Sequence, residues 1–420
     1  MSSIGWIDFS SEHRERLRTV LDMLSAPTVL DELGIGPVRD AFADRMFPGI
    51  STIQTRAKYF TLTACLLKRF IDTKHRSNGA KLERYLAEEE KRCRIQLVGR
   101  DSTEIGIIGG RFGTNSKRDV VRKPSSIYWN GLRLYGIIKP RDLSLAEFSQ
   151  RLSDNRWFLR NLLEARGDDQ GDDTDADELA GRPRVIAPDV PADYLDDLSI
   201  TLLPEEADFL HHQITATQSD SLLGQILISH ENMGMVADLK DSSFEDFADL
   251  PFIAGLKSEE LRRTVQHARD FWLIMEGAHI RYNCLLQSRL GTRETEEEFE
   301  TLWTDWVERI RVFPKNWDTS FMWALGTKQG GRVKERTQRF LEAWIEETRG
   351  GCRNLNRCDE LVISQEKFNK LGRARLRAGN KDSIGPKWVG IRDLDYRQTQ
   401  VCRIVRDIRD GLLRKGDRDA

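Results

Sequence analysis

The sequence predicts a mainly α-helical protein, with two or three helical domains and little β structure. Three observations favour this class: apolar residues recur at helical spacing, capping patterns precede several apolar segments, and alternating strand patterns are scarce. At 420 residues the chain is too long for one compact core, which predicts more than one domain. The two strand candidates are RIQLVG, residues 94–99, and EIGIIGG, residues 104–110.

Charge is segregated along the chain and marks three predicted segments. Residues 1–160 hold 28 Lys and Arg against 19 Asp and Glu, a net charge of +9, and are expected to form a basic N-terminal helical domain with glycine turns. Residues 161–200 are rich in Asp, Gly and Pro, which is typical of a linker or exposed loop; the alternative is a polyanion that covers a basic nucleic-acid site. Residues 201–420 are expected to form a helical C-terminal domain with a basic end.

The composition favours a non-catalytic cytoplasmic protein without metal or cofactor. No apolar run approaches the ~20 residues that span a membrane, and residues 1–8 lack the pattern of a signal peptide. The 6 cysteines and 7 histidines do not form a metal-ligand pattern, so reduced thiols are expected. His279 lies on an apolar helical stripe and is more typical of a core histidine than of a ligand. No hydrolase, zinc-protease or kinase motif is present.

Helices are expected where apolar residues share one face, and some have recognisable ends. The capping-box sequences Ser51–Gln54 and Thr295–Glu298 predict helix starts, and Pro37 suits the first position of a helix. The expected helical segments include residues 10–25, 37–46, 52–70, 205–214, 258–290, 295–313, 330–351 and 393–415.

Two glycine turns near the N-terminus resemble those of a helix-hairpin-helix DNA-binding motif. LGIGP, residues 33–37, differs by one position from the usual Leu-Pro-Gly-Ile-Gly, and FPGI, residues 47–50, forms the second turn. In such turns backbone N–H groups and the following helix N-terminus hold a DNA phosphate. The candidate phosphate contacts are Gly34, Gly36, Arg39, Gly49, Arg56 and Lys58.

A purely structural corner between helices explains the same glycines and prolines. The placement of the basic side chains distinguishes the two interpretations. If Arg39, Arg56 and Lys58 enter a salt-bridged core, the turns are corners and nothing more.

A second glycine-rich stretch, residues 104–142, joins a basic loop to an aromatic helix. It matches neither the Walker A pattern nor the dinucleotide-binding pattern. Basic and aromatic residues together suit nucleic acid, but Tyr128, Trp129 and Tyr135 are expected to be core residues. The loop cations expected to contact phosphate are Arg111, Lys117, Arg118, Arg122 and Lys123.

Three stretches carry a resemblance to a known family: DELGIGPVRDAFADRMFPGISTIQTRAKYF, PSSIYWNGLRLYGI and LDYRQTQVCRIVRDI. They resemble an uncharacterised bacterial family catalogued as domain of unknown function 6361, over nearly the whole chain. Members tend to be encoded near helicases, methyltransferases or phospholipase-D-like nucleases in phage-defence neighbourhoods. The resemblance therefore implies a defence or DNA-processing context, and it implies no catalytic residues.

These observations lead to one functional hypothesis and two alternatives. We expect a DNA-binding or scaffolding subunit that acts with a helicase or nuclease in bacterial anti-phage defence. The first alternative is a protein-interaction adaptor without nucleic-acid contact, which exposure of Trp303, Trp306 or Trp344 would support. The second is a divergent metal-dependent nuclease, which would need a cluster of carboxylates.

Overall fold

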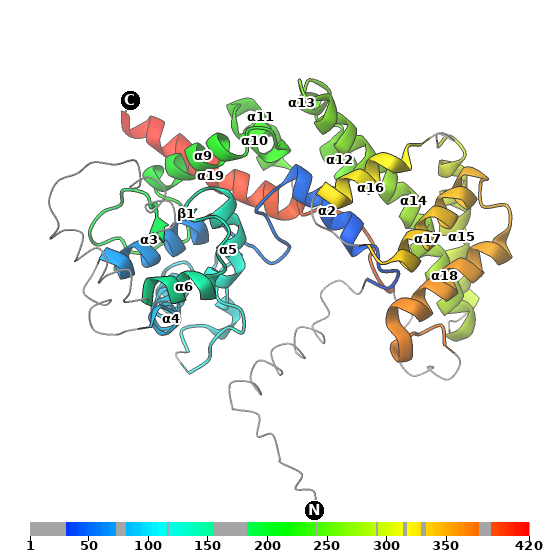
Figure 1. Ribbon diagram of the computed structural model, residues 1–420, viewed down its shortest axis with the longest axis horizontal. Coiled ribbons are helices and arrows are strands. Elements are labelled where there is room, and N and C mark those ends of the chain that lie inside the picture. The colour runs from blue at the N-terminus through cyan, green and yellow to red at the C-terminus, as the bar shows by residue number, and fades with distance from the viewer. Residues whose placement is uncertain are drawn as a thin grey trace, which may run out of the picture. The chain divides into compact units, whose positions relative to one another are not determined.

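The computed structural model confirms a mainly α-helical protein (Figure 1). It describes residues 31–72, 81–115, 117–153, 183–239, 242–290, 293–313, 317–328, 333–377 and 388–419. The expected helix at 10–25 and most of the acidic stretch, residues 154–182, lie outside these residues. No helix in the described part is both long enough and apolar enough to cross a membrane.

The chain divides into two compact units, each assembled from separate stretches of sequence. Unit 1 comprises Met1–Gly36, Trp272–Trp317 and Val333–Leu394. Unit 2 comprises Pro37–Phe271, Asp318–Arg332 and Asp395–Ala420. The segments 1–160, 161–200 and 201–420, expected from the charge pattern, stay a prediction.

Unit 2 contains most of the N-terminal helices, a two-stranded antiparallel sheet and the C-terminal helix. Its elements are α2 (Gly36–Met46), α3 (Lys58–Asp72), α4 (Leu82–Arg100), η2 (Gly110–Phe112), α5 (Pro124–Leu134), β1 (Ile138–Lys139), α6 (Leu145–Ser153), β2 (Arg184–Val185), α9 (Pro204–Thr217), α10 (Leu222–Leu227), α11 (His230–Asp238), α12 (Phe244–Ala248), α13 (Pro251–Ala254), the first half of α14 (Glu259–Leu290), α16 (Thr319–Lys328) and α19 (Gln398–Asp419). In the sheet, Ile138 pairs with Val185 and Lys139 with Arg184.

The C-terminal helix α19 organises one side of unit 2. It packs along α9 and α11, although more than 150 residues separate it from each of them in the chain (Figure 1). Its apolar face contributes Val401, Ile404, Val405 and Ile408, each fully buried. The opposite face, which carries arginines and aspartates, is left for polar contacts.

Helices α3 and α5 form a second packed pair in unit 2. The ring of Phe60 meets the ring of Tyr128 edge-on with centroids 4.7 Å apart, and that of Tyr135 at 5.3 Å. Tyr128 and Tyr135 are fully buried and Trp129 is 7% exposed, which confirms that the aromatic residues of this stretch are core.

Unit 1 is built around the second half of α14. Its other elements are α15 (Arg293–Ile310), α17 (Glu335–Arg349), α18 (Leu355–Lys370) and η3 (Leu371–Arg373). Trp306 and Trp344 stack with centroids 6.3 Å apart, and each indole N–H donates to a carbonyl of α14, Leu273 and Ile274 respectively. The second half of α14 is thereby fixed by polar as well as apolar contacts.

Several expected element positions are wrong. Residues 94–99 are helical because Cys93, Leu97 and other buried positions of α4 follow helical spacing. Residues 104–110 form turns, since Gly106 and Gly109 have φ of +97° and +74°. Helix α3 begins at Lys58 rather than Thr52, and α15 begins at Arg293, two residues before the predicted cap.

Candidate nucleic-acid interface

The amides of the first glycine turn are occupied by a carboxylate of the same chain. Asp31 accepts hydrogen bonds from Ile35 N at 3.0 Å and from Gly36 N at 2.7 Å. Gly34 has φ of +74°, and a Cβ there would meet the Asn369 side chain at 3.1 Å. Asn369 Nδ2 also donates to the Asp31 carbonyl at 2.7 Å. The turn is closed by internal bonds on the side where a phosphate would bind.

Arg39, on α2, is held by its neighbour along the helix. Its Nε and Nη2 both lie 3.0 Å from Asp40 Oδ1. Arg397 also approaches Asp40, at 3.5 Å, and forms an ion pair with Asp44. The Arg39 guanidinium therefore lies in a network of alternating charges rather than in an isolated basic patch.

The second glycine turn packs tightly against α5. Gly49 has φ of +83°, and a Cβ there would lie 2.8 Å from the Tyr135 ring. Tyr135 Oη donates to Pro48 O at 3.0 Å, and Gln54 Nε2 donates to Gly49 O at 3.0 Å. Gln54 Oε1 also accepts from Ser51 N at 3.3 Å, so the Gln54 side chain stabilises the turn, while the next helix begins only at Lys58.

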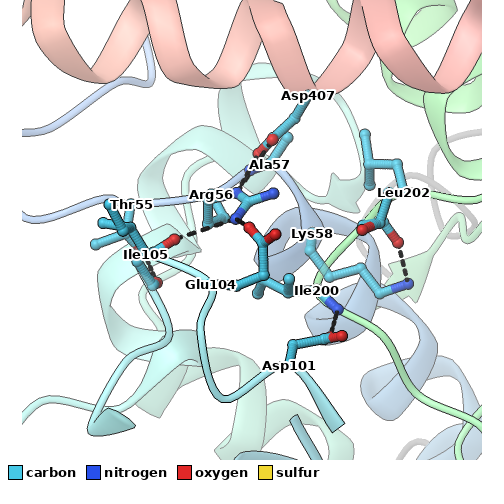
Figure 2. Close-up of polar contacts among 12 residues, drawn as sticks. Thr55, Arg56, Ala57, Lys58, Asp101, Glu104, Ile105, Ile200, Leu202 and Asp407 are labelled. Carbon is cyan, nitrogen blue, oxygen red and sulfur yellow. Dashed lines mark hydrogen bonds and ion pairs between the residues drawn. The ribbon is translucent and has the colours of Figure 1, made fainter. Parts of the chain in front are cut away.

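The N-terminus of α3 is capped by α19. Asp407 Oδ2 accepts from Ala57 N at 2.9 Å, and both carboxylate oxygens lie 3.0 Å from Arg56 Nε (Figure 2). Arg56 Nη1 also pairs with Glu104 at 3.1 Å, so this side chain lies between two carboxylates (Figure 2). Burial raises the pKa of Asp407, while Arg56 pulls it down. A carboxylate already occupies the anion position at this helix terminus.

Lys58 is a core residue. Its ammonium lies 2.6 Å from Glu206, and the two side chains are 2% and 0% exposed. Glu206 also accepts from Tyr194 Oη at 2.6 Å, from Thr61 Oγ1 at 2.5 Å and from Leu203 N at 2.7 Å. The placement of Arg56 and Lys58 favours the structural-corner interpretation of the two turns, and neither residue belongs to the interface proposed below.

A buried arginine of α4, Arg94, holds the backbone of the loop between α4 and α5. Arg94, 4% exposed, donates to the carbonyls of Gly113 at 2.8 Å, Asn115 at 3.0 Å and Arg118 at 3.1 Å. The guanidinium forms no ion pair with any carboxylate in the described ranges. Its charge therefore adds to that of the loop.

Two further side chains fix the start of the loop. Tyr59 Oη accepts from Ile108 N at 2.8 Å. Thr55 Oγ1 donates to Gly106 O at 2.6 Å. The loop backbone is consequently attached to α3 and α4 at several points.

Three of the five basic side chains of this loop are exposed. Arg111, Lys117 and Arg118 are exposed, and Arg122 is half-buried. Within the described residues none of these four has a carboxylate partner. Lys123 differs from them, because its ammonium pairs with Asp119 at 3.0 Å. The backbone of the loop is thus fixed, while four of its cations have no carboxylate partner in the described residues. The two N-terminal turns also have fixed backbones, but the cations near them, Arg39, Arg56 and Lys58, are paired with carboxylates.

A buried carboxylate of α4, Glu90, holds the start of α5. Glu90 Oε1 accepts from Ser125 N, in the first turn of α5, at 2.6 Å, and Oε2 has no partner among the described residues. Burial raises the pKa of Glu90 to about 7. A cavity of about 10 Å³ lies beside it, lined also by Arg94 and Lys123. A volume of this size holds roughly one water molecule.

A larger polar groove of about 570 Å³ lies on the outer face of α19. Its other walls come from residues 103–105, which lead into the basic loop, from residues 201–202, and from Arg56, which is bonded to Asp407 and Glu104. From α19 it is lined by Arg403, Arg406, Asp407, Asp410 and Arg414. We refer to this site as the α19 groove.

The groove arginines and Arg94 were not among the candidate residues predicted from the sequence. The spacing of Arg403, Arg406 and Arg414 places them on one polar face of a helix whose apolar face was recognised, and this spacing was available in the sequence. No such pattern exists for Arg94, because its partners are backbone carbonyls of a loop without regular structure.

Other candidate residues are core residues. His279 is fully buried, and its Nδ1 lies 2.9 Å from Met275 O, as expected for a core histidine. Trp303, Trp306 and Trp344 are 7%, 0% and 0% exposed, so the exposure that would have supported a protein adaptor is not found. No group of three or more His, Cys, Asp or Glu suited to a metal ion occurs in the part of the chain that the structure describes.

The family resemblance of the sequence is confirmed by comparison with known proteins. No curated protein and no solved structure matches the chain. A family model described as "Family of unknown function (DUF6361)" matches residues 1–156 and 169–411. Because this match covers nearly the whole sequence, the chain belongs to the family of unknown function DUF6361.

Proposed function

We propose that this protein is a non-catalytic nucleic-acid-binding subunit and that the loop at residues 106–123 contacts the phosphate backbone. One observation carries the proposal: Arg94 and its neighbours fix the loop backbone, while Arg111, Lys117, Arg118 and Arg122 have no carboxylate partner in the described residues. A fixed loop loses little conformational entropy when it binds.

Phosphate is the ligand class that best suits this arrangement. Guanidinium and ammonium groups without internal partners attract a polyanion, and the release of its counterions drives binding. The exposed Arg111 guanidinium lies 5.9 Å from the Phe112 ring centroid, a cation–π contact that uses none of its N–H donors. The contacts are to the backbone, so we expect little sequence preference.

We further propose that this binding serves a helicase or nuclease complex of bacterial anti-phage defence in the cytoplasm, with DNA as the favoured nucleic acid. Support for the context comes from the gene neighbourhoods that the family resemblance implies. Support for a reducing compartment comes from the six cysteines, which are all free and buried.

The experiment compares nucleic-acid affinity across a salt series by fluorescence anisotropy, with labelled single-stranded and duplex DNA and with RNA. The test variant is R111E/K117E/R118E. The control, K257E/R311E/R353E, changes the same total charge at exposed positions outside the loop. Circular dichroism checks the fold of both variants.

We expect the loop variant to lose at least about tenfold in affinity and to show a shallower salt dependence, by roughly three in the slope of log K against log salt for duplex DNA. The control should retain most of the wild-type affinity. Absence of binding at low salt, or equal losses in the two variants, would overturn the proposal.

A further inference from the structure

The α19 groove has the features of a small-molecule site, and we propose that it binds a phosphate-bearing ligand of nucleotide size. This inference goes beyond the proposed nucleic-acid contact, because it uses none of the loop cations between residues 111 and 123. All walls of the groove belong to unit 2.

The groove arginines project from one face of α19. Arg403, Asp407, Asp410 and Arg414 are spaced by three or four residues, so their side chains lie in one row along the helix. Arg406 flanks this row. A ligand in the groove can therefore meet several guanidinium groups at once.

Each carboxylate that lines the groove already has an arginine partner. Asp407 is bonded to Arg56 and Ala57 N, and Glu104 to Arg56 Nη1 (Figure 2). Asp410 pairs with Arg409, whose Nη2 lies 3.1 Å from Oδ1. Because Arg56 is shared by two of these three carboxylates, their negative charge is reduced but not cancelled.

The three arginines of α19 that line the groove have no carboxylate partner among the described residues. Arg414 Nη2 donates to Leu202 O at 3.0 Å, and Arg406 donates to the carbonyls of Ala237 and Leu239. Arg403 has no hydrogen bond or ion pair within the described ranges, and its side chain lines the groove. The excess positive charge of the groove lies along this row.

Phosphate fits this donor set, because planar guanidinium groups bind phosphate oxygens through paired hydrogen bonds. The volume of about 570 Å³ lies in the usual range for small-molecule sites. The hydroxyl-bearing Thr103 and Thr201 and the exposed Ile105 offer polar and apolar surface to the remainder of a ligand.

The exposed carboxylates limit which phosphate ligands fit. Glu104 and Asp410 side chains are 49% and 42% exposed, and they would repel a polyanion laid along the whole groove. One phosphate group or a short phosphate chain avoids that repulsion. Such a group belongs to a free nucleotide or to the terminal nucleotide of a nucleic-acid strand.

The test measures binding to the full chain by isothermal titration calorimetry at low salt, with inorganic phosphate, AMP and ATP as probes. The variants are R403A and R403A/R414A. The matched control is K257A, which removes a charge at an exposed position of unit 2 outside the groove lining. Because Arg403 makes no internal bond in the described chain, R403A is expected to fold as the wild type does.

We expect AMP or ATP to bind the wild type, to be displaced by inorganic phosphate, and to lose at least about tenfold in affinity in R403A/R414A but not in K257A. Tighter binding of a 5′-phosphorylated oligonucleotide than of its 5′-hydroxyl form, with loss in R403A, would assign the phosphate to a strand end. Equal binding of the two oligonucleotides would assign it to a free nucleotide.

Two results would overturn the inference: failure of all three phosphate probes to bind the wild type, and equal affinity of the wild type and R403A/R414A. The R111E/K117E/R118E variant separates this outcome from that of the proposed function. It should lose nucleic-acid affinity while retaining AMP affinity, because its substitutions lie outside the groove.

Discussion

Asp407 shows how one side chain can decide the role of a distant basic residue. It lies 350 positions from Ala57 in the chain, yet it caps the helix that Ala57 precedes and neutralises Arg56. Removing one member of a buried pair leaves the other charge without compensation. Substitution of Arg56 or Lys58 would therefore lower the free energy of unfolding, and this loss would obscure any effect on ligand binding.

We predict that Asp407→Asn lowers the free energy of unfolding by about 3 kcal/mol, because the Arg56 guanidinium loses its buried counter-charge and keeps only the more exposed Glu104. Urea denaturation followed by circular dichroism measures the loss. Asp410→Asn is the matched control, one turn along α19, and should cost less than about 1 kcal/mol because its partner Arg409 is more exposed. Equal costs for the two substitutions would contradict the assigned role of Asp407.

Glu90 predicts a pH dependence of stability. Its pKa is about 7 in the folded protein, above the ordinary value of 4.5, because it is buried. The folded state therefore binds more protons than the unfolded state between these values, and stability contributed by this group falls as the pH rises from about 4.5 to 7.

We predict that the free energy of unfolding of Glu90→Gln rises relative to that of the wild type as the pH rises from 5 to 8. The difference should reach up to about 3 kcal/mol. Glutamine retains an oxygen that can accept from Ser125 N. The measurement is a set of urea unfolding curves across this pH range. Glu88→Gln, on the exposed face of the same helix, should show no such trend. A constant difference between Glu90→Gln and the wild type would contradict the burial effect.

At the scale of elements, α14 and α15 depend on a glycine contact. A Cβ on Gly277 would lie 2.2 Å from the Trp306 ring, which is fully buried. Only the absence of a side chain lets the indole lie flat against α14 and donate to Leu273 O. Here close packing outweighs the cost of glycine inside a helix, which is roughly 1 kcal/mol relative to alanine.

We predict that Gly277→Ala lowers stability by about 2 kcal/mol or more, because Trp306 must move from its site. Thermal unfolding monitored by tryptophan fluorescence measures the change. Gly234→Ala in α11 is the control: no atom lies within 4 Å of its added Cβ, so it should stabilise by up to about 1 kcal/mol. Stabilisation by both substitutions would contradict the packing argument.

The loop at residues 106–123 is an element without regular structure whose conformation comes from its neighbours. The Arg94 side chain, which projects from α4, donates hydrogen bonds to three loop carbonyls that would be bonded to backbone N–H groups in a helix or strand. Periodicity within α4 identifies the buried position but not the type of its partners. The conformation of a functional loop of this kind is not predictable from its own sequence.

At the scale of the whole molecule, formal charge counts overstate the basic surface near the N-terminus. The net charge of +9 in residues 1–160 includes Arg56 and Lys58, whose partners Asp407 and Glu206 come from beyond that segment. Conversely, the groove arginines of α19 share a unit with the basic loop although nearly 300 residues separate them in the chain. Charge segregation along the chain is therefore a poor guide to charge segregation on the surface.

The sequence by itself determined the mainly α class, the long helices such as α14 and α19, and the burial of Tyr128, Trp129 and Tyr135. These features follow from apolar spacing within one segment, which burial enforces locally. Only the tertiary structure decided that Arg56 and Lys58 are neutralised, that the loop cations are not, and that α19 forms one wall of a groove. Ion pairs and hydrogen bonds depend on which distant residues are brought within about 3 Å, and no local pattern records that distance.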